Sequence, residues 1–574
     1  MTVSGGELLA RALKAADVKV VFALHGGHLD PFLLACQEIG IKLIDGRHEG
    51  AVGHAAEGYA KASGTLGVAA VTAGAGFANG VASLVSAHTD RTPMLMITSS
   101  PPLAEAELNE LQGGIDQVAV ARPVTRWAQR VTATRRIPDL TALAVRKALG
   151  VPPGPVLLEV PVDLMFAEVD ETRIVPSGHA IVAPLPGPAE EAVEAAGSIL
   201  RSARRPVIVA GNGLRYARAE PALRAFADRS GIPVFSQMGT SWLPNEHPLK
   251  AFGAWYLAAL GQQDATRPDA VLLAGARMGR YLGGRTGSII PHSARIVQID
   301  IDASEIGRLR PVDQPVVADA AQALRSLAAD PRAWPDWSGW AAAATGAHRA
   351  RSQFADEPHY LSGRMHPYHA VRTALEQIPH GSTIVVDGGE AAGWVWESLA
   401  RSRHRDVIGF GGYTGILGAS TGMAIGAQVA RPGTQVVLFC GDGAAGFHIQ
   451  EFDTMVRHSL PIVVVVVNNA LWGQSVRGQE KRYGKRGVVI SRLDDTGYEL
   501  VARGFGARGE RVAKLEDVPG AMNRSFAEGR PACVNLSVAY GPEPRTAAGM
   551  SRRPASGEIS LPYYETTATA PGHG

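Results

Sequence analysis

Short apolar runs alternate with longer Ala- and Gly-rich stretches along most of the chain. The runs are rich in Val and Ile and are apolar at successive positions, as in Val68–Thr72 and Ile462–Asn468. Such runs are typical of strands buried on both faces of a parallel sheet, and the stretches between them suit covering helices. The pattern therefore predicts an α/β fold with three doubly wound parallel-sheet domains in series.

The predicted strands fall into three groups, which set the expected domains. We expect the first domain in residues 1–168, the second in 188–343 and the third in 367–539, with a linker at Asp170–Gly187. Residues 540–574 are rich in Pro, Gly and Thr, so we expect a C-terminal tail without its own core. The expected strands are Val18–Ala23, Val68–Thr72, Met94–Thr98, Val156–Val160, Pro206–Ala210, Ala270–Ala274, Arg295–Ile301, Thr383–Asp387, Gln435–Cys440, Ile462–Asn468 and Ala532–Leu536.

Composition and charge limit the classes of function. The net charge of +2 gives no electrostatic reason to expect a nucleic-acid partner. The three cysteines, Cys36, Cys440 and Cys533, are too far apart for a disulfide framework or a zinc site, which favours the reducing cytosol. No signal segment is recognisable, and the longest apolar run, Ile462–Val467, cannot span a bilayer. We therefore expect a cytoplasmic protein without a membrane partner.

Polar groups follow two neighbouring predicted strands of the third domain. A Gly-Asp-Gly turn occupies 441–443, and an Asn-Asn pair occupies 468–469. The carboxyl ends of parallel strands share one edge of a sheet, where ligands of α/β folds bind. Asp442 and Asn469 offer the oxygen ligands that Mg²⁺ prefers, and small residues up to Ala444 leave backbone N–H groups open to a phosphate. Taken alone, each group is also explained as an ordinary turn.

Together, the two groups resemble the thiamine diphosphate (ThDP) motif of the acetolactate synthase and pyruvate decarboxylase superfamily. Asp442 and Asn469 are 27 positions apart, the spacing of that motif. The resemblance covers nearly the whole chain and implies ThDP and Mg²⁺ as cofactors. It assigns Mg²⁺ to Asp442, Asn469 and the backbone carbonyl of Leu471. The residues it assigns to ThDP are Glu49, Gly389, Glu390, Leu417, Gly441, Gly443, Ala444, Asn469, Gly473 and Gln474.

Glu49 is the expected activating acid, and Leu417 is the expected apolar wedge beneath the bent cofactor. The segment 45–51 around Glu49 matches the family pattern between a strand and a helix. A carboxylate there hydrogen-bonds the pyrimidine ring of ThDP so that the C2 proton can leave. A lone glutamate at a helix start is also explained by the helix dipole. Because Glu49 and the metal site lie in different domains, the resemblance implies a homodimer as the minimum unit, with a homotetramer common.

Residues near the expected substrate space distinguish members of the superfamily. His25, His28, Gln112 and Glu480 are the candidates for catalysis. The segments 25–28, 47–49 and 472–475, together with the loop around Gln112, most resemble bacterial 2-hydroxyacyl-CoA lyases, which split a 2-hydroxyacyl-CoA into formyl-CoA and an aldehyde or ketone. That resemblance implies a glutamate on a short helix after the ThDP motif, which is Glu480 here. The histidines are also explained by loop hydrogen bonds or by a metal site, and Glu480 by a solvated charge.

Two departures count against acetolactate synthesis. Gly113 stands where acetolactate synthases usually have a glutamate, and Gly478 stands where they carry a tryptophan. The alternatives to the lyase are a 2-oxo acid decarboxylase or carboligase of acetolactate synthase type, and a cyclic 1,2-diketone hydrolase. An inactive regulatory homologue would have lost Glu49, Asp442 or Asn469, and all three are present.

The central domain and the tail suggest contacts to a nucleotide-bearing molecule. Residues 211–213, 275–277 and 300–302 offer glycines and acids that relatives use for FAD, for the ADP part of CoA, or for no ligand. The tail 540–574 is expected either as a lid over a CoA thioester or as a disordered end. The tail residues suited to CoA are Arg545, Arg552, Arg553, Tyr563 and Tyr564.

Overall fold

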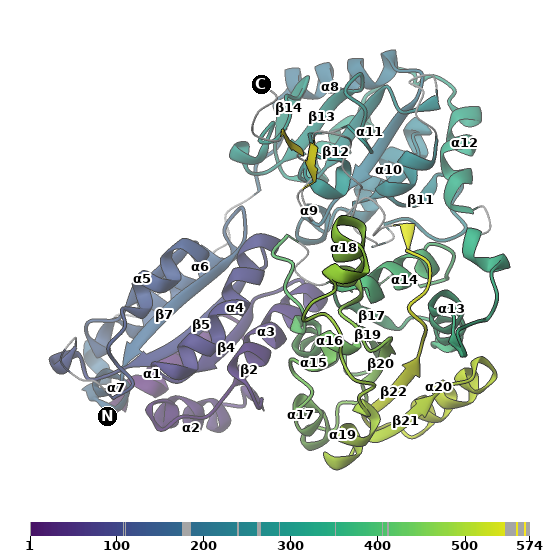
Figure 1. Cartoon of the computed structure of the whole chain (residues 1–574). Coiled ribbons are helices and arrows are strands. Elements are labelled where there is room, and N and C mark those ends of the chain that lie inside the picture. Colours follow the sequence, from purple (N-terminus) through teal and green to yellow (C-terminus); the bar gives the residue numbers. More distant parts are fainter. Residues whose placement is uncertain are drawn as a thin grey trace.

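A computed structural model gives the structure of the chain (Figure 1). It describes residues 2–574 except 107, 109–110, 175–184, 238–239, 241, 261–265, 286, 350–351, 405, 410–412, 546–557, 561–566 and 570–574. The described residues contain three six-stranded parallel sheets, each covered by helices on both faces. The predicted fold class is therefore confirmed.

The first sheet has the strand order β3-β2-β4-β5-β7-β6. Helices α1, α2 and α6 pack on one face, and α3 and α4 on the other. The strands are β2 (Val20–Ala23), β3 (Lys42–Asp45), β4 (Gly67–Val71), β5 (Met94–Ser100), β6 (Trp127–Arg130) and β7 (Pro155–Pro161). The helices are α1 (Gly5–Ala15), α2 (Asp30–Glu38), α3 (Glu49–Ser63), α4 (Ala75–Asp90) and α6 (Ile137–Leu149).

The central sheet has the order β11-β10-β9-β12-β13-β14. Its strands are β9 (Pro206–Ala210), β10 (Val234–Ser236), β11 (Lys250–Gly253), β12 (Ala270–Ala274), β13 (Arg295–Asp300) and β14 (Gln314–Val317). Its helices include α8 (Glu190–Ser202), α9 (Gly213–Tyr216), α10 (Glu220–Ser230), α11 (Ala320–Ala329) and α12 (Ser338–Arg349). Figure 1 shows this domain above the other two.

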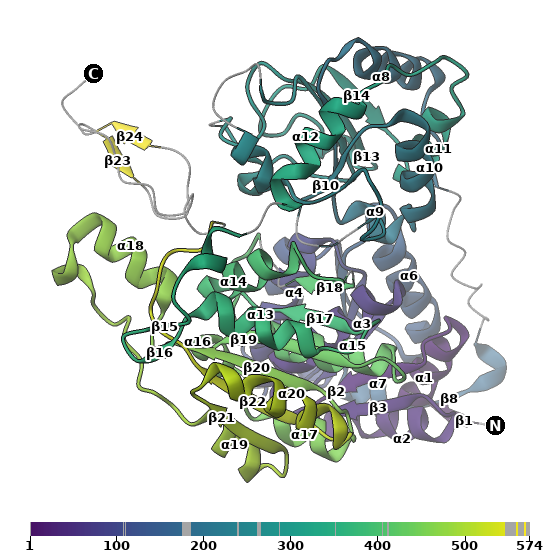
Figure 2. The same cartoon turned by 90° about the vertical axis from the view of Figure 1, so that its right-hand side faces the viewer.

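The third sheet has the order β18-β17-β19-β20-β22-β21. Its strands are β17 (Thr383–Val386), β18 (Val407–Gly409), β19 (Val436–Gly441), β20 (Val463–Asn468), β21 (Arg508–Val512) and β22 (Ala532–Ser537). Its helices are α13 (Pro367–Gln377), α14 (Gly389–Leu399), α15 (Ala419–Ala430), α16 (Asp442–Ala445), α17 (Glu451–Arg457), α18 (Gly473–Tyr483), α19 (Tyr498–Gly504) and α20 (Val518–Ala527). Helix α18 lies at the edge of this domain (Figure 2).

Helices α3 and α15 join the first and third domains by close glycine-mediated packing. A Cβ atom on Gly426 would lie 1.9 Å from the carbonyl oxygen of Ala55, and one on Gly58 would lie 2.3 Å from that of Met423. The two helix backbones can approach this closely only because these positions lack side chains. This contact places the start of α3 and the segment before α15 relative to each other.

Two antiparallel strand pairs lie outside the three sheets. Strand β1 (Thr2–Ser4) pairs with β8 (Glu168–Asp170), and β23 (Glu558–Ser560) pairs with β24 (Thr567–Thr569) in the tail. Of the tail residues expected to contact CoA, Arg545 is described, whereas Arg552, Arg553, Tyr563 and Tyr564 lie outside the described residues. Among the described helices, none has the length and apolar character needed to cross a membrane.

Candidate active site

One cleft of the third domain collects the residues expected to hold the diphosphate and the metal. It encloses about 460 Å³ at the carboxyl ends of β17, β19 and β20, where α14, α16 and α18 begin. The predicted residues that line it are Gly389, Glu390, Leu417, Gly441, Asp442, Gly443, Ala444, Asn469, Leu471, Gly473 and Gln474. Sequence analysis did not assign Pro367, Trp394, Trp472 and Val538, which line the same cleft. Of these four residues, only Trp472 is next in sequence to predicted ligands, Leu471 and Gly473, so the motif around them could have indicated it.

The three expected metal ligands are held together by one backbone amide. The N–H of Leu471 lies 3.1 Å from Oδ2 of Asp442 and 3.2 Å from Oδ1 of Asn469. The turn between the two side chains places Ala470 at a φ of 58°, in the left-handed region. Burial raises the pKa of Asp442 to about 6. A buried, oxygen-rich corner with one carboxylate is the chemistry that a hard divalent cation requires.

Two glycines of the cleft, Gly443 and Gly473, leave no room for side chains. A Cβ atom on Gly443 would lie 2.4 Å from the ring of Trp472. One on Gly473 would lie 2.7 Å from Oε2 of Glu390 and 3.1 Å from Nδ2 of Asn469. The first residues of α14 and α18 also line the cleft, so unpaired backbone N–H groups are available to an anion there. This donor set fits a diphosphate that is bound together with Mg²⁺.

Asp387 fixes the segment that carries the expected wedge. Its buried carboxylate accepts hydrogen bonds from the backbone N–H groups of Gly388 (2.7 Å), Gly418 (3.2 Å) and Ser420 (3.2 Å). Leu417 directly precedes this anchored turn and lines the cleft. The carboxylate of Asp387 therefore fixes the wall of the cleft, because it binds backbone N–H groups on the segment that carries Leu417.

Glu49 begins α3 at the carboxyl edge of the first sheet. Its side chain is buried, and its Oε2 accepts a hydrogen bond of 3.0 Å from the side-chain amide of Asn79. A Cβ atom on Gly76 would lie 3.4 Å from the other carboxylate oxygen. The first turn of α4 thus leaves one side of the carboxylate without a covering side chain.

The loop that carries His25 and His28 and the loop that carries Gln112 both lie at the carboxyl edge of the first sheet. A Cβ atom on Gly26 would lie 2.4 Å from that of Thr72, and one on Gly74 would lie 3.0 Å from Cα of Gln112. The backbone of Gln112 has a φ of 55°, and its side chain lines a separate cleft of about 680 Å³. Segments far apart in sequence are therefore gathered around the turn between β4 and α4, beside Glu49.

The two candidate histidines differ in their surroundings. His25 is 70% exposed, and its Nε2 lies 2.9 Å from Oδ1 of Asp30. His28 is partly buried, which lowers the pKa of its imidazole, and its buried Nδ1 has no hydrogen-bond partner among the described residues. His28 is therefore the one suited to accept a proton from a bound molecule. The described residues contain no group of three or more His, Cys, Asp or Glu side chains that could hold a metal ion.

Two other histidines of the first domain contact the third domain. The ring of His48 lies 5.3 Å from that of His448, and the ring of His54 lies 6.3 Å from it. Nδ1 of His448 lies 2.9 Å from the carbonyl oxygen of Gly418. Burial lowers the pKa of His448 to about 4, and the two neighbouring imidazoles add to the effect.

This shift predicts a loss of stability in mild acid. An imidazole whose pKa is lower in the folded state stabilises the fold fully above its unfolded pKa of about 6.5 and loses that contribution as the pH falls toward 4. We expect His448→Gln to remove up to about 3 kcal/mol of this pH dependence of the free energy of unfolding. Urea denaturation at pH 4.5 and 7.5 measures it. An unchanged difference between the two pH values would contradict the assignment to His448.

Glu480 does not line the cofactor cleft. It lies on α18 about two turns beyond Gly473. Its carboxylate accepts a hydrogen bond of 2.8 Å from the hydroxyl of Tyr540, which belongs to the start of the tail. Glu480 therefore lies on the helix that begins at the cleft, and its side chain contacts the start of the tail.

Glu49 and the cofactor cleft are separate within one chain. Every described residue that lines the cleft comes from the third domain, including Pro367 at the start of α13. The candidates of the first domain, including Glu49 and Gln112, gather at the edge of their own sheet. A single chain thus presents two halves of the predicted site, each at the carboxyl edge of a parallel sheet.

The three segments expected to hold a nucleotide follow three neighbouring strands of the central sheet, β9, β12 and β13. The glycines at 211–213 pack against Gly275, whose carbonyl oxygen would lie 2.2 Å from a Cβ atom on Gly211. The carboxylate of Asp302 is 2.8 Å from Arg91 and accepts a hydrogen bond from the hydroxyl of Ser304. These contacts hold the segments together, and FAD or CoA binding at this edge of the central sheet stays a prediction.

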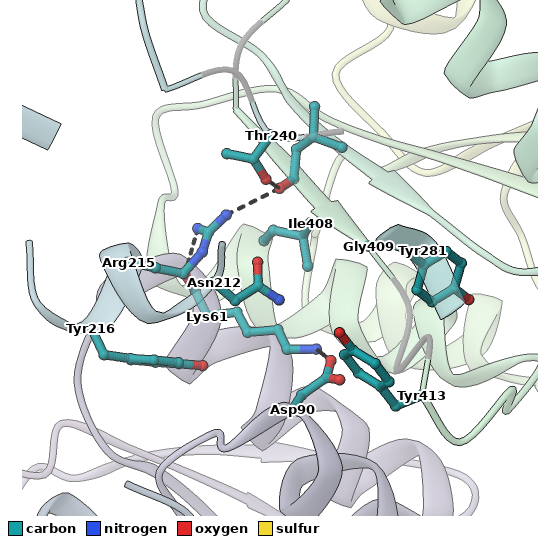
Figure 3. Close-up of a pocket in the computed structure, with 11 residues that line it drawn as sticks. Lys61, Asp90, Asn212, Arg215, Tyr216, Thr240, Tyr281, Ile408, Gly409 and Tyr413 are labelled. Atoms are coloured by element: carbon teal, nitrogen blue, oxygen red, sulfur yellow. Dashed lines mark hydrogen bonds and ion pairs between the residues drawn. The ribbon is translucent and has the colours of Figure 1, made fainter. Parts of the chain in front are cut away.

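A small pocket lies where the three domains meet (Figure 3). Lys61 extends toward Asp90, with 2.7 Å between its Nζ and the carboxylate, and also pairs with Glu57. Arg215 donates hydrogen bonds to the carbonyl oxygens of Lys61 and Val407. These contacts join the end of α3 to the central and third domains, and they support the orientation of the helix that begins at Glu49.

Three parallel sheets, a cleft with a metal and diphosphate donor set, and a buried glutamate at a helix start define a ThDP-dependent enzyme. Comparison with protein families agrees over most of the chain. Residues 3–120 match the N-terminal thiamine pyrophosphate (TPP) binding domain of TPP enzymes, 193–327 match their central domain, and 387–536 match their C-terminal TPP binding domain.

Individual relatives give the same result. The chain is 33% identical to the acetolactate synthase large subunit of Mycobacterium tuberculosis over 549 residues, which cover 94% of this chain and 97% of that protein. It is 29% identical to human 2-hydroxyacyl-CoA lyase 2 over 582 residues, which cover 93% and 90% of the two chains. The acetolactate synthase large subunit of Lactococcus lactis is 28% identical over 88% of this chain and 87% of its own. The chain belongs to the thiamine pyrophosphate enzyme family.

Proposed function

We propose that the protein is a ThDP- and Mg²⁺-dependent lyase that cleaves 2-hydroxyacyl-CoA to formyl-CoA and an aldehyde or ketone, reversibly. The observation that carries the proposal is the unpartnered Nδ1 of His28. Cleavage beside a hydroxyl group requires a base for the hydroxyl proton, and an imidazole whose pKa is lowered by burial is neutral and able to accept it.

The space along α18 also favours this proposal over acetolactate synthesis. A Cβ atom on Gly478 would meet no atom within 4 Å, so no bulky side chain restricts this face of the helix. A thioester with a long pantetheine arm needs such room. The relatives include proteins named 2-hydroxyacyl-CoA lyase 2 and proteins named acetolactate synthase, so the comparisons support both candidates.

The cofactor roles follow from the donor set of the cleft. Asp442, Asn469 and the carbonyl of Leu471 would bind Mg²⁺, and the helix starts at Gly389 and Gly473 would bind the diphosphate. When bound, ThDP supplies the nucleophilic carbon. Glu49 would hold a proton on the pyrimidine ring, and Leu417 would support the bent cofactor from below.

Assembly would complete the site. The cleft lacks a residue of the first domain among the described residues, and Glu49 lies at another edge. A second copy of the chain, related by two-fold symmetry, would bring its Glu49 over the cleft of the first copy. Glu49 of the first copy would then lie over the cleft of the second. We therefore propose a homodimer as the functional minimum.

Mass spectrometry of CoA species tests the reaction. The protein is mixed with ThDP, Mg²⁺ and a panel of 2-hydroxyacyl-CoAs that differ in chain length, with parallel reactions containing pyruvate or a cyclic 1,2-diketone. We expect formyl-CoA together with the matching aldehyde or ketone. Intact thioesters combined with consumption of pyruvate would instead support a carboligase of acetolactate synthase type.

A further inference from the structure

A buried ion pair forms part of the wall of the cofactor cleft. Arg477 on α18 and Glu390 on α14 are 8% and 6% exposed. The guanidinium donates two hydrogen bonds to the carboxylate, from Nε to Oε2 at 2.6 Å and from a terminal nitrogen to Oε1 at 2.8 Å. This two-point geometry is the strongest arrangement of an arginine and a carboxylate.

The arginine is also fixed by the start of the tail. A terminal nitrogen donates to the carbonyl oxygens of Gly541 (2.8 Å) and Pro542 (3.0 Å). Its guanidinium carbon lies 4.6 Å from the ring centre of Tyr540. Arg477 is therefore held from several sides and cannot turn away from Glu390 without breaking these contacts.

The charge of Glu390 creates a problem for an anionic cofactor. Glu390 lines the cleft, next to the helix start that would bind the diphosphate. An unpaired buried carboxylate is costly, and it would repel the negative diphosphate across a short, poorly hydrated distance. A neutral pair removes most of this repulsion, while the carboxylate still closes the wall against Gly473.

We propose that Arg477 is a positioning residue that sets the affinity for ThDP by neutralising Glu390 at the wall of the cleft. The proposal rests on the assignment of this cleft to the diphosphate. It does not depend on which substrate the enzyme turns over, because its test measures binding of the cofactor.

The two partners of the pair are expected to act in opposite directions. Arg477→Met leaves the carboxylate unpaired and should weaken ThDP binding by about 100-fold. Glu390→Gln removes the negative charge beside the diphosphate and should tighten ThDP binding. The double variant, which has neither charge, should bind within about fivefold of wild type. A pair with a merely structural role would weaken binding in both single variants.

Isothermal titration of each variant with ThDP at fixed Mg²⁺ measures the dissociation constants. Arg477→Lys retains the positive charge and replaces Arg477→Met in the titration if the Met variant does not fold. We expect it to bind within about tenfold of wild type. Tyr540→Phe is the matched control, because it removes the hydroxyl that binds Glu480 but keeps the ring beside Arg477, so its affinity should not change.

The outcomes separate two failures. Wild-type affinity in Arg477→Met, or a double variant as weak as that single variant, would overturn the role of Arg477. Wild-type affinity in Asp442→Asn would instead show that the cofactor does not bind through this cleft, and the assignment of the site would fail with it.

Discussion

Replacement of Glu49 by glutamine is expected to slow hydrogen–deuterium exchange at C2 of bound ThDP by roughly 10²–10⁴-fold. The carboxylate is buried at the start of α3, and one side of it faces a glycine. Glutamine keeps the shape and can still accept the hydrogen bond from Asn79, so the fold should be preserved. What it loses is the ability to hold an exchangeable proton for the pyrimidine ring. Rapid acid quenching followed by NMR of the released cofactor measures the exchange rate.

A matched change elsewhere in the same domain controls for nonspecific effects. Glu38→Gln alters an exposed carboxylate at the end of α2 and should leave the exchange rate unchanged. An exchange rate in the Glu49 variant within about twofold of wild type would exclude Glu49 as the activating acid, since a positioned proton-transfer group contributes far more.

Mixing inactive variants tests the proposed site between two chains. If Glu49 of one chain serves the cleft of the other, a mixture of Glu49→Gln and Asp442→Asn proteins contains dimers with one intact site. Activity should then return after subunit exchange, although each variant alone is inactive. No recovery in dimers that demonstrably exchange subunits would place both residues of one site in the same chain.

Most inner strands of the three sheets could be predicted from sequence, whereas the six edge strands and the three-residue inner strand β10 could not. Strands such as β9 and β12 are apolar at every position because helices cover both faces, and their bounds match the prediction. The edge strands β3, β6, β14 and β21 were missed. Each carries polar residues and is partly exposed, so it lacks the continuous apolar run of a central strand.

Local motifs predicted the cleft better than long-range contacts. Residues that follow the ends of neighbouring parallel strands, such as Asp442 after β19 and Asn469 after β20, meet at a sheet edge by geometry alone. Trp394 and Val538 line the same cleft but come from a helix interior and from beyond β22, where no motif marks them. The pairing of Arg477 with Glu390 likewise depends on how α18 packs against α14, which sequence spacing does not encode.

Replacement of Asp442 by asparagine is expected to weaken Mg²⁺-dependent ThDP binding by roughly 10²–10³-fold. Asparagine has nearly the same shape and can accept the hydrogen bond from the N–H of Leu471, so the turn should survive. It lacks the negative charge, and Mg²⁺ would lose the only carboxylate of its proposed ligand set. Equilibrium dialysis with ThDP at varied Mg²⁺ measures the loss, and Asp517→Ala, an exposed change in the same domain, is the control.

The same substitution should separate stability from binding. In the metal-free protein, burial raises the pKa of Asp442 to about 6, so the ionised carboxylate present at neutral pH costs more free energy in the fold than in the unfolded chain. Removal of that charge should leave the melting temperature of the cofactor-free protein equal or higher at pH 7.5. The wild type should gain stability when ThDP and Mg²⁺ are added, because they bind only the folded state, and the variant should not. A carboxylate is costly to bury, and the cation that Asp442 would bind explains why one is present at this position. Equal stabilisation of wild type and variant by ThDP and Mg²⁺ would therefore contradict the role of Asp442.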